Sequence, residues 1–230
     1  YVGGVKWNEN TTDRTNDFLN AMYGPARITI DDEGWVYICD NGPVSDKTSG
    51  VWRMNPANPS AKFVDVLADA SGKSQRGTLY QRINSAVVTG TTEQGKKLIV
   101  VDNEGDGNNS KLIRFSLNAT GTLLAGEMGT QLLNLYENNI INAHNTIVRG
   151  AYDDLWIFQY RNSDNASYPG VLHINSDGTV DLSVGQQYNR RGSGAISPDG
   201  NWLAYCGLGT SVIRIVPISY GDDKTPSIDW

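Results

Sequence analysis

The chain has 230 residues, of which 39% are hydrophobic and 19% charged, so it is long enough to bury a full core and can form one all-β domain. The formal net charge of −6 and the pI near 4.9 argue against a broad nucleic-acid-binding or anionic-membrane surface. The 25 Gly, 11 Tyr and 6 Trp favour a turn-rich β protein, and no apolar run is long enough to span a bilayer.

Residues 1–25 carry the weakest pattern. Residues 1–7 can form a strand, and Phe18, Leu19 and Met22 are spaced as in one short helical turn. We treat 1–25 as an N-terminal segment whose strand is expected to pair with the far C-terminus and complete the last of the repeated units that follow.

Residues 26–230 consist of imperfect copies of one unit. The first copy, 26–67, contains four short β-prone runs separated by the turn Asp32-Glu33-Gly34, a polar loop and a Pro/Asn turn. Later copies begin near Asn84, Ala143 and Gly192. Four strands in little more than forty residues is the size of one β-propeller blade.

The third run of each copy supports this alignment. These runs are VWRM, LIRF, VLHI and VIRI, and their aligned third residues are Arg53, Arg114, His173 and Arg214. His173 is therefore expected to be structural. A β-sandwich is the alternative, but its strands show no four-strand unit. We predict an all-β fold, a β-propeller with about four to five recognisable four-stranded blades, which leaves open whether the chain is part of a larger propeller.

The blades resemble those of NHL-type and YncE-like propellers over residues 26–230, and the stretch ISPDGNWLAYC at 196–206 is similar to an inner-strand signature in many of them. Those families usually have six or seven blades. The four copies here are consistent with a small ring, with a degenerate blade within residues 1–25, or with part of a larger propeller.

Long connections are expected at one end of every blade. The links between second and third strands and between blades are long, and up-and-down strands place both classes at the same end. Aromatic rings, amides and charges there suit sugars or polar peptides, although solvated loops without a ligand are the alternative. The predicted ligand-binding residues are Tyr80, Tyr136, His144, Tyr160, Arg161, Tyr168, Tyr188, Arg190 and Arg191.

Residues 102–108 contain a candidate calcium loop. Asp102, Glu104 and Asp106 place oxygen donors at alternate positions, and Gly107 is the sixth residue, as in a calcium loop. Ile113 stands at the twelfth position, where a bidentate Glu would close the cage. The alternative is a plain Gly-Asn turn, and we expect no other cofactor.

The two cysteines, Cys39 and Cys206, each lie five positions into a run that starts with Trp. Such equivalent sites in different blades are too far apart for a disulfide. Both are expected to be small buried residues.

No triad, phosphate loop or multi-histidine pattern is present in the sequence. The leading hypothesis is a non-catalytic, extracellular or cell-surface binding domain that recognises a carbohydrate or protein partner through the loop-rich face. The composition resembles surface proteins of glycan-foraging Gram-negative bacteria, which favours a secreted or cell-surface location and leaves outer-membrane anchoring or the periplasm open. The alternatives are a propeller hydrolase or lyase that uses acidic residues such as Asp40, Asp102 and Asp106, with or without Ca²⁺, and a structural domain of a larger surface protein.

Overall fold

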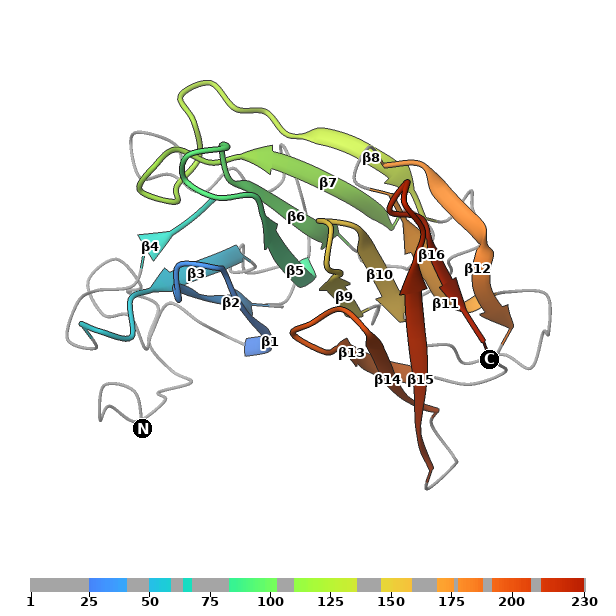
Figure 1. The fold of residues 1–230 in the computed structure, drawn as a ribbon. Helices are drawn as coiled ribbons and strands as arrows, with labels where there is room; N and C mark the ends of the chain where they lie inside the picture. Colours follow the sequence, from blue (N-terminus) through green and yellow to red (C-terminus); the bar gives the residue numbers. More distant parts are fainter. Residues whose placement is uncertain are drawn as a thin grey trace. The chain divides into compact units, whose positions relative to one another are not determined.

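The chain is all β. The computed structural model describes residues 25–40, 50–58, 64–67, 83–102, 110–135, 146–158, 169–175, 178–187, 192–207 and 212–229, and these contain sixteen strands in four four-stranded antiparallel sheets. In every sheet the strands pair in the order in which they follow along the chain (Figure 1). None of the described segments forms a helix of the length and apolarity that a membrane crossing requires.

Each sheet corresponds to one repeat of the sequence. Sheet 1 contains β1 (Pro25–Ile30), β2 (Val36–Asp40), β3 (Gly50–Met54) and β4 (Val64–Asp65). Sheet 2 contains β5 (Ile83–Thr89), β6 (Lys97–Asp102), β7 (Lys111–Ser116) and β8 (Thr130–Asn134). Sheet 3 contains β9 (Thr146–Arg149), β10 (Leu155–Phe158), β11 (Pro169–Ile174) and β12 (Val180–Gln187). Sheet 4 contains β13 (Gly192–Ile196), β14 (Trp202–Gly207), β15 (Ile213–Tyr220) and β16 (Pro226–Ile228).

The predicted four-strand unit is confirmed. The runs VWRM, LIRF, VLHI and VIRI fall at β3, β7, β11 and β15, the third strand of each sheet. Internal contacts divide the chain into two compact units, residues 1–105 with 112–131 and residues 106–111 with 132–230. The predicted pairing of the N-terminal segment with the C-terminus concerns residues 1–24, which lie outside the described residues.

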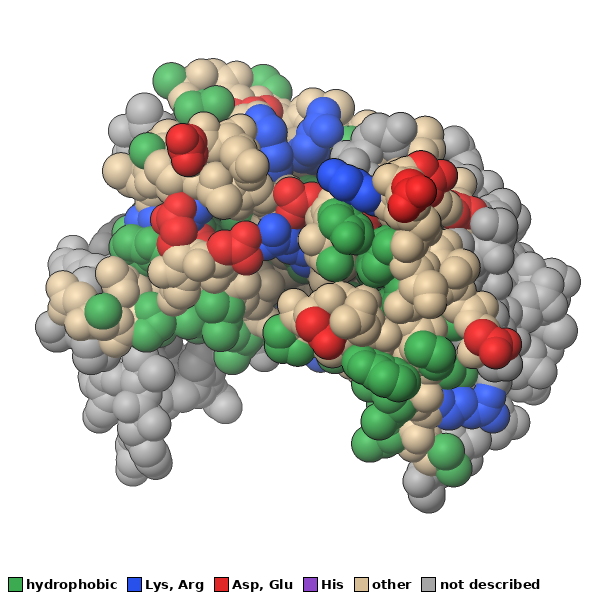
Figure 2. Space-filling view, viewed as in Figure 1, with side chains coloured by type: hydrophobic (Ala, Val, Ile, Leu, Met, Phe, Trp, Pro, Cys, Tyr) green, Lys and Arg blue, Asp and Glu red, His purple; other side chains and the backbone are tan. Residues whose placement is uncertain are grey.

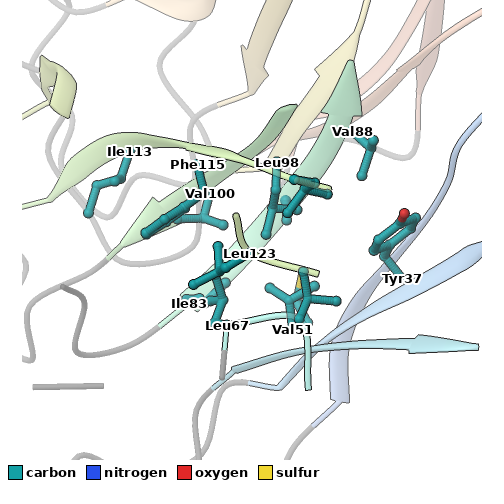
Figure 3. Packing of buried hydrophobic residues seen from close by; sticks show 14 residues of the cluster. Tyr37, Val51, Leu67, Ile83, Val88, Leu98, Val100, Ile113, Phe115 and Leu123 are labelled. Carbon is teal, nitrogen blue, oxygen red and sulfur yellow. The ribbon is translucent and has the colours of Figure 1, made fainter. Parts of the chain in front are cut away.

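The core of the first unit lies between sheets 1 and 2 (Figure 3). Tyr37, Cys39 and Val51 of sheet 1 are fully buried and belong to one cluster with Leu98 and Val100 of β6. β-Branched and aromatic residues at alternate positions put these side chains on one face of each sheet. Within a pair of packed sheets, we call the face that the first sheet turns to the second its forward face, and the face that the second turns to the first its rear face. The opposite face of each sheet takes the other name.

The core of the second unit repeats this arrangement. Trp156 and Phe158, on the forward face of sheet 3, pack with Leu203 and Tyr205, on the rear face of sheet 4. Gly194 on β13 faces the Phe158 ring so closely that a Cβ at this position would overlap it. The two sheets therefore approach each other where one lacks a side chain.

The aligned third residues do not all point the same way. His173 pairs with Trp156 on the forward face of sheet 3 and is fully buried, as expected for a structural residue. Arg214 pairs with Tyr205 on the rear face of sheet 4 and is exposed. The repeat thus fixes the strand order, while the register of each hairpin decides the direction of the side chain.

A buried aspartate joins sheet 1 to sheet 2. Asp31, in the first hairpin turn of sheet 1, accepts hydrogen bonds from Tyr37 Oη at 3.1 Å and from Lys96 Nζ of the next sheet at 2.6 Å. The side chains of Lys96 and Asp31 are 2% and 1% exposed. Burial alone would lower the pKa of Lys96, but its hydrogen bonds to Asp31 and Glu33 raise it, so it stays charged.

Asp154 makes the corresponding link in the second unit. Its Oδ2 accepts hydrogen bonds from Trp156 Nε1 at 2.9 Å and from Tyr220 Oη of sheet 4 at 3.2 Å, and lies 3.0 Å from His173 Nε2. Burial would raise the pKa of Asp154, but the hydrogen bonds from His173 and from the Tyr152 backbone hold it below its usual value. A buried charge is tolerated here because it is fully partnered.

We expect Lys96→Met to destabilise the protein by about 3–5 kcal/mol, because it leaves the Asp31 carboxylate buried without its cation. The measurement is urea unfolding of the folded protein. Lys97→Met is the matched control: Lys97 is only half-buried and its ammonium contacts the Ser116 hydroxyl, so the loss should be at most about 1 kcal/mol. Equal losses in the two variants would show that the Asp31 link does not stabilise the fold.

Candidate functional site

All nine predicted ligand-binding residues lie outside the described residues, as do two of the three residues of the candidate calcium loop. These are Tyr80, Tyr136, His144, Tyr160, Arg161, Tyr168, Tyr188, Arg190 and Arg191, together with Glu104 and Asp106 of the candidate calcium loop. They stay predictions. Of the predicted set the structure describes Asp102, and within the described ranges no three His, Cys, Asp or Glu side chains gather as a metal site.

Asp102 has an exact counterpart in sheet 1. Asp40 ends β2 and Asp102 ends β6, and the pairings Pro25↔Asp40 and Ile83↔Asp102 are each followed by a register shift in the first strand. The two side chains are 0% and 1% exposed. Buried carboxylates therefore stand in equivalent places, at the end of the sheet from which the long connections leave, which we call the loop-bearing end.

Asp65 adds a second carboxyl group at this end of sheet 1. It ends β4, and its Oδ1 accepts a hydrogen bond from Leu67 N at 3.0 Å. Burial is the main cause that raises the pKa of Asp65 to about 6, and the charge of Asp40 raises it further, against the hydrogen bond from Leu67. Asp65 consequently titrates within the mildly acidic range, beside a second buried carboxyl group.

Trp52 brings a hydrogen-bond donor to the same place. It pairs with Asp65 across β3 and β4, while Gly50 pairs with Asp40 across β3 and β2. A Cβ at Gly50 would lie 3.7 Å from Asp65 Oδ1 and 3.8 Å from Trp52 Nε1. The indole nitrogen is buried and has no hydrogen-bond partner among the described residues.

This group, which we call the Asp40–Asp65 site, has a defined chemistry. Carboxyl groups accept hydrogen bonds from hydroxyls, the indole N–H donates one, and the indole ring offers an apolar surface. A carboxyl that can hold a proton near pH 6 beside another acid is also the arrangement that general acid–base catalysis uses. The sequence indicated it only through the repeated dipeptides Asp40-Asn41 and Asp102-Asn103.

The two cysteines are free, and their environments differ. Cys39 is buried in the first core, as predicted, and burial raises the pKa of its thiol to about 12. Cys206 is exposed, so the prediction that it is buried is wrong. It pairs with Ile213 on the forward face of sheet 4, and Ile213 is exposed as well.

Comparisons with known proteins identify the fold. No family model matches the chain, and no curated protein matches its sequence. Similar solved structures include a luciferin-regenerating enzyme, with a TM-score of 0.54, 13% identity, and coverage of 90% of this chain and 59% of that one. An exo-1,5-α-L-arabinanase from a bovine ruminal metagenomic library has a TM-score of 0.50 and 12% identity, with coverage of 88% of this chain and 76% of that one. An auxiliary nutrient binding protein from Bacteroides ovatus has a TM-score of 0.50 and 14% identity, with coverage of 89% of this chain and 42% of that one.

These likenesses concern the fold alone, because the identities are so low. With the four-stranded meanders, they confirm the all-β, β-propeller class. The chain spans 59% of the luciferin-regenerating enzyme and 42% of the nutrient binding protein, and thus only part of either.

We expect Asp65→Asn to stabilise the protein at pH 7 by about 3 kcal/mol, at about 1.4 kcal/mol for each unit by which the pKa is raised. A carboxyl with a raised folded-state pKa favours folding below pH 4, and this contribution is lost as the pH rises through about 6. Asparagine is neutral throughout and retains an acceptor for Leu67 N. Urea unfolding at pH 4 and pH 7 should therefore show a gain only at pH 7.

Asp199→Asn is the control of opposite sign. The hydrogen bonds that Ser197 and Asn201 donate lower the pKa of the exposed Asp199, so its charge favours folding above its unfolded-state pKa. Replacing it should cost stability at pH 7 and not at low pH. An Asp65 variant with the same profile as the Asp199 variant would contradict a raised pKa at Asp65.

Proposed function

We propose that this chain is a non-catalytic binding domain that holds a carbohydrate at the loop-bearing end of its sheets. The observation that carries the proposal is the Asp40–Asp65 site: the Asp65 carboxyl and the Trp52 indole N–H, which has no partner among the described residues, both lie near the missing side chain of Gly50, and the charge of Asp40 is close enough to raise the pKa of Asp65. Sugar hydroxyls donate to carboxylates and accept from an indole, and buried polar groups at the edge of a rigid sheet are preorganised for this.

Other features support the same class of function. In the sequence, the predicted tyrosines and arginines fall between strands that end or begin at the loop-bearing end, so we expect them to add to the same site. The fold-level likeness to a protein described as an auxiliary nutrient binding protein agrees with a binding role. A secreted or cell-surface location, the closer resemblance to NHL-type and YncE-like repeats, and a protein as partner in place of a sugar belong to the proposal as further expectations.

A hydrolase is the second candidate, and one observation favours it. Asp65 can hold a proton near pH 6 while Asp40 lies close enough to raise its pKa, so one group could donate a proton while the other acts as base or nucleophile. Fold-level likeness to an arabinanase is consistent with such chemistry. Calcium held by Asp102, Glu104 and Asp106 would be compatible with either function. The third alternative, a purely structural role, predicts neither glycan binding nor glycan cleavage.

The test is a glycan array at pH 7, followed by calorimetry on the strongest ligand. Trp52→Phe keeps the ring and removes the N–H donor, so affinity should fall about three- to tenfold. Asp65→Asn should also weaken binding, since the amide keeps one acceptor oxygen and replaces the other with an NH2 donor. Trp35→Phe is the matched control, because Trp35 lies at the hairpin end of the same sheet, beside Asp31, and should not contact the ligand.

The outcomes separate the candidates. Unchanged affinity in both Trp52→Phe and Asp65→Asn would place any bound glycan elsewhere, and Tyr160→Ala and Tyr188→Ala then test the predicted connections. Glycan cleavage that Asp65→Asn abolishes would establish the hydrolase. The absence of both binding and cleavage would leave the structural role.

A further inference from the structure

Arg53 is a buried cation with unused hydrogen-bond donors. It lies on β3, pairs with Tyr37 on the forward face of sheet 1, and is only 7% exposed. Its Nε–H is buried and has no acceptor, and within the described part of the chain its guanidinium makes no hydrogen bond or ion pair. A guanidinium carries five N–H donors, and leaving them unpaired in the interior is costly. Buried donors of this kind point to a partner from outside the chain.

Two neighbours fix the guanidinium of Arg53 without using its donors. Trp35 packs against the first core, and the Cζ of Arg53 lies 4.0 Å from the centre of its ring, where the ring face attracts the cation. The turn that follows β7 approaches from sheet 2, because a Cβ at Gly121 would lie 2.5 Å from Nη1 of Arg53. Gly121 has a φ of +74°, a conformation that glycine adopts without strain. Stacking on the ring leaves the in-plane N–H groups available, so the donors are oriented before any ligand arrives.

Asp31 is close enough to act on Arg53 but has no acceptor position left for it. Burial lowers the pKa of Arg53, and the negative charge of Asp31 opposes this effect. Oδ1 of Asp31 accepts hydrogen bonds from two backbone N–H groups of its own turn at 3.0 Å and 2.9 Å. Oδ2 accepts from Tyr37 and Lys96. A carboxylate offers about four acceptor positions, so the Asp31 carboxylate is saturated and the donors of Arg53 stay unused.

The charges around Arg53 select the kind of partner. Lys96 contacts both Asp31 and Glu33, which leaves one negative charge that Arg53 balances. Inorganic phosphate or sulfate would bring up to two further negative charges, whereas a carboxylate brings one. A carboxylate is also planar, and its two oxygens match the fork of a guanidinium. Figure 2 shows Lys and Arg side chains beside Asp and Glu side chains, so in this view the described surface has no broad positive area that would hold anions unspecifically.

We propose that Arg53 binds the carboxylate group of an acidic ligand, through two parallel hydrogen bonds in the plane that Trp35 sets. The carboxylate reaches the guanidinium through the part of Arg53 that stays exposed. Its source is either a small free acid or the acid group of a uronic sugar. Arg53 lies at the hairpin end of sheet 1, one residue before the end of β3, and the Asp40–Asp65 site lies at the other end. This inference therefore does not depend on the proposed carbohydrate site.

The test titrates the folded protein with sodium acetate, while sodium chloride keeps the ionic strength constant. Nitrogen-15 NMR follows the arginine Nε–H signals, and the Arg53 signal is the one missing from Arg53→Lys. In wild type this signal should shift and saturate with a Kd of about 1–100 mM, as expected for one bidentate pair. Thermal unfolding gives a second readout. Because acetate binds the folded state, replacing about 0.2 M chloride with acetate should raise the Tm of wild type by a few degrees.

Arg53→Lys keeps the positive charge and removes the fork, so the affinity should fall about tenfold and most of the rise in Tm should be lost. Arg114→Lys is the matched control: Arg114 is the aligned residue of β7 but is only half-buried, so water already hydrates it. It should keep the wild-type rise. Equal rises in the two lysine variants overturn the proposal, and so does a wild-type Arg53 signal that acetate does not move.

Glucuronate, glucose and inorganic phosphate identify the ligand chemistry. Glucuronate should shift the Arg53 signal and glucose should not. Tighter binding of glucuronate than of acetate assigns the site to acidic sugars, and equal binding assigns it to the carboxylate group alone; either result supports the site. Phosphate should bind more weakly than acetate, because it brings more negative charge to the same group. Phosphate that binds more tightly than acetate, or glucose that shifts the Arg53 signal as glucuronate does, contradicts a carboxylate site.

Discussion

A buried carboxylate that must find its partner in the next sheet is the constraint on which both units depend. Asp31 is neutralised by Lys96 of sheet 2, and Asp154 is held by Tyr220 of sheet 4. The two aspartates occupy opposite sides of their hairpin turns, since Asp31 opens one and Asp154 closes the other. The same requirement is therefore met by different local chemistry, an ion pair in one unit and neutral donors with His173 in the other. In each case a misplaced neighbouring sheet would leave a charge buried without compensation.

The carboxyl groups at the two ends of a sheet have different roles. At the hairpin end the carboxylates are saturated with donors from the protein, so they hold the fold and offer nothing to a ligand. At the loop-bearing end, Asp65 has one described backbone donor and a raised pKa, and the indole of Trp52 has no described acceptor. Polar groups with remaining hydrogen-bonding capacity are what a binding site needs, and the opposite end supplies the rigidity to hold them.

The strand order was predictable because it depends on local signals: four-strand periodicity and turn residues such as Ser176-Asp177-Gly178 act within a few positions. The Asp40–Asp65 site was not, because it requires the register that sets Trp52 opposite Asp65 and Gly50 opposite Asp40. Cys39 and Cys206 show the same limit. Their local sequences match, yet one is buried and the other exposed, since burial of a strand face depends on whether another sheet covers it. Arg214 differs from His173 through the register of its hairpin.

The links from Asp31 and Asp154 also bear on how the protein folds. Each connects residues far apart in sequence, 65 positions in one case and 66 in the other, and in each the acid precedes its donor. A polypeptide that emerges from the ribosome exposes the acceptor first and gains its counterpart only when the following repeat has been synthesised. Sheets should therefore become stable in consecutive pairs and not one at a time, which gives the repeat array a nearest-neighbour cooperativity with a fixed direction along the chain.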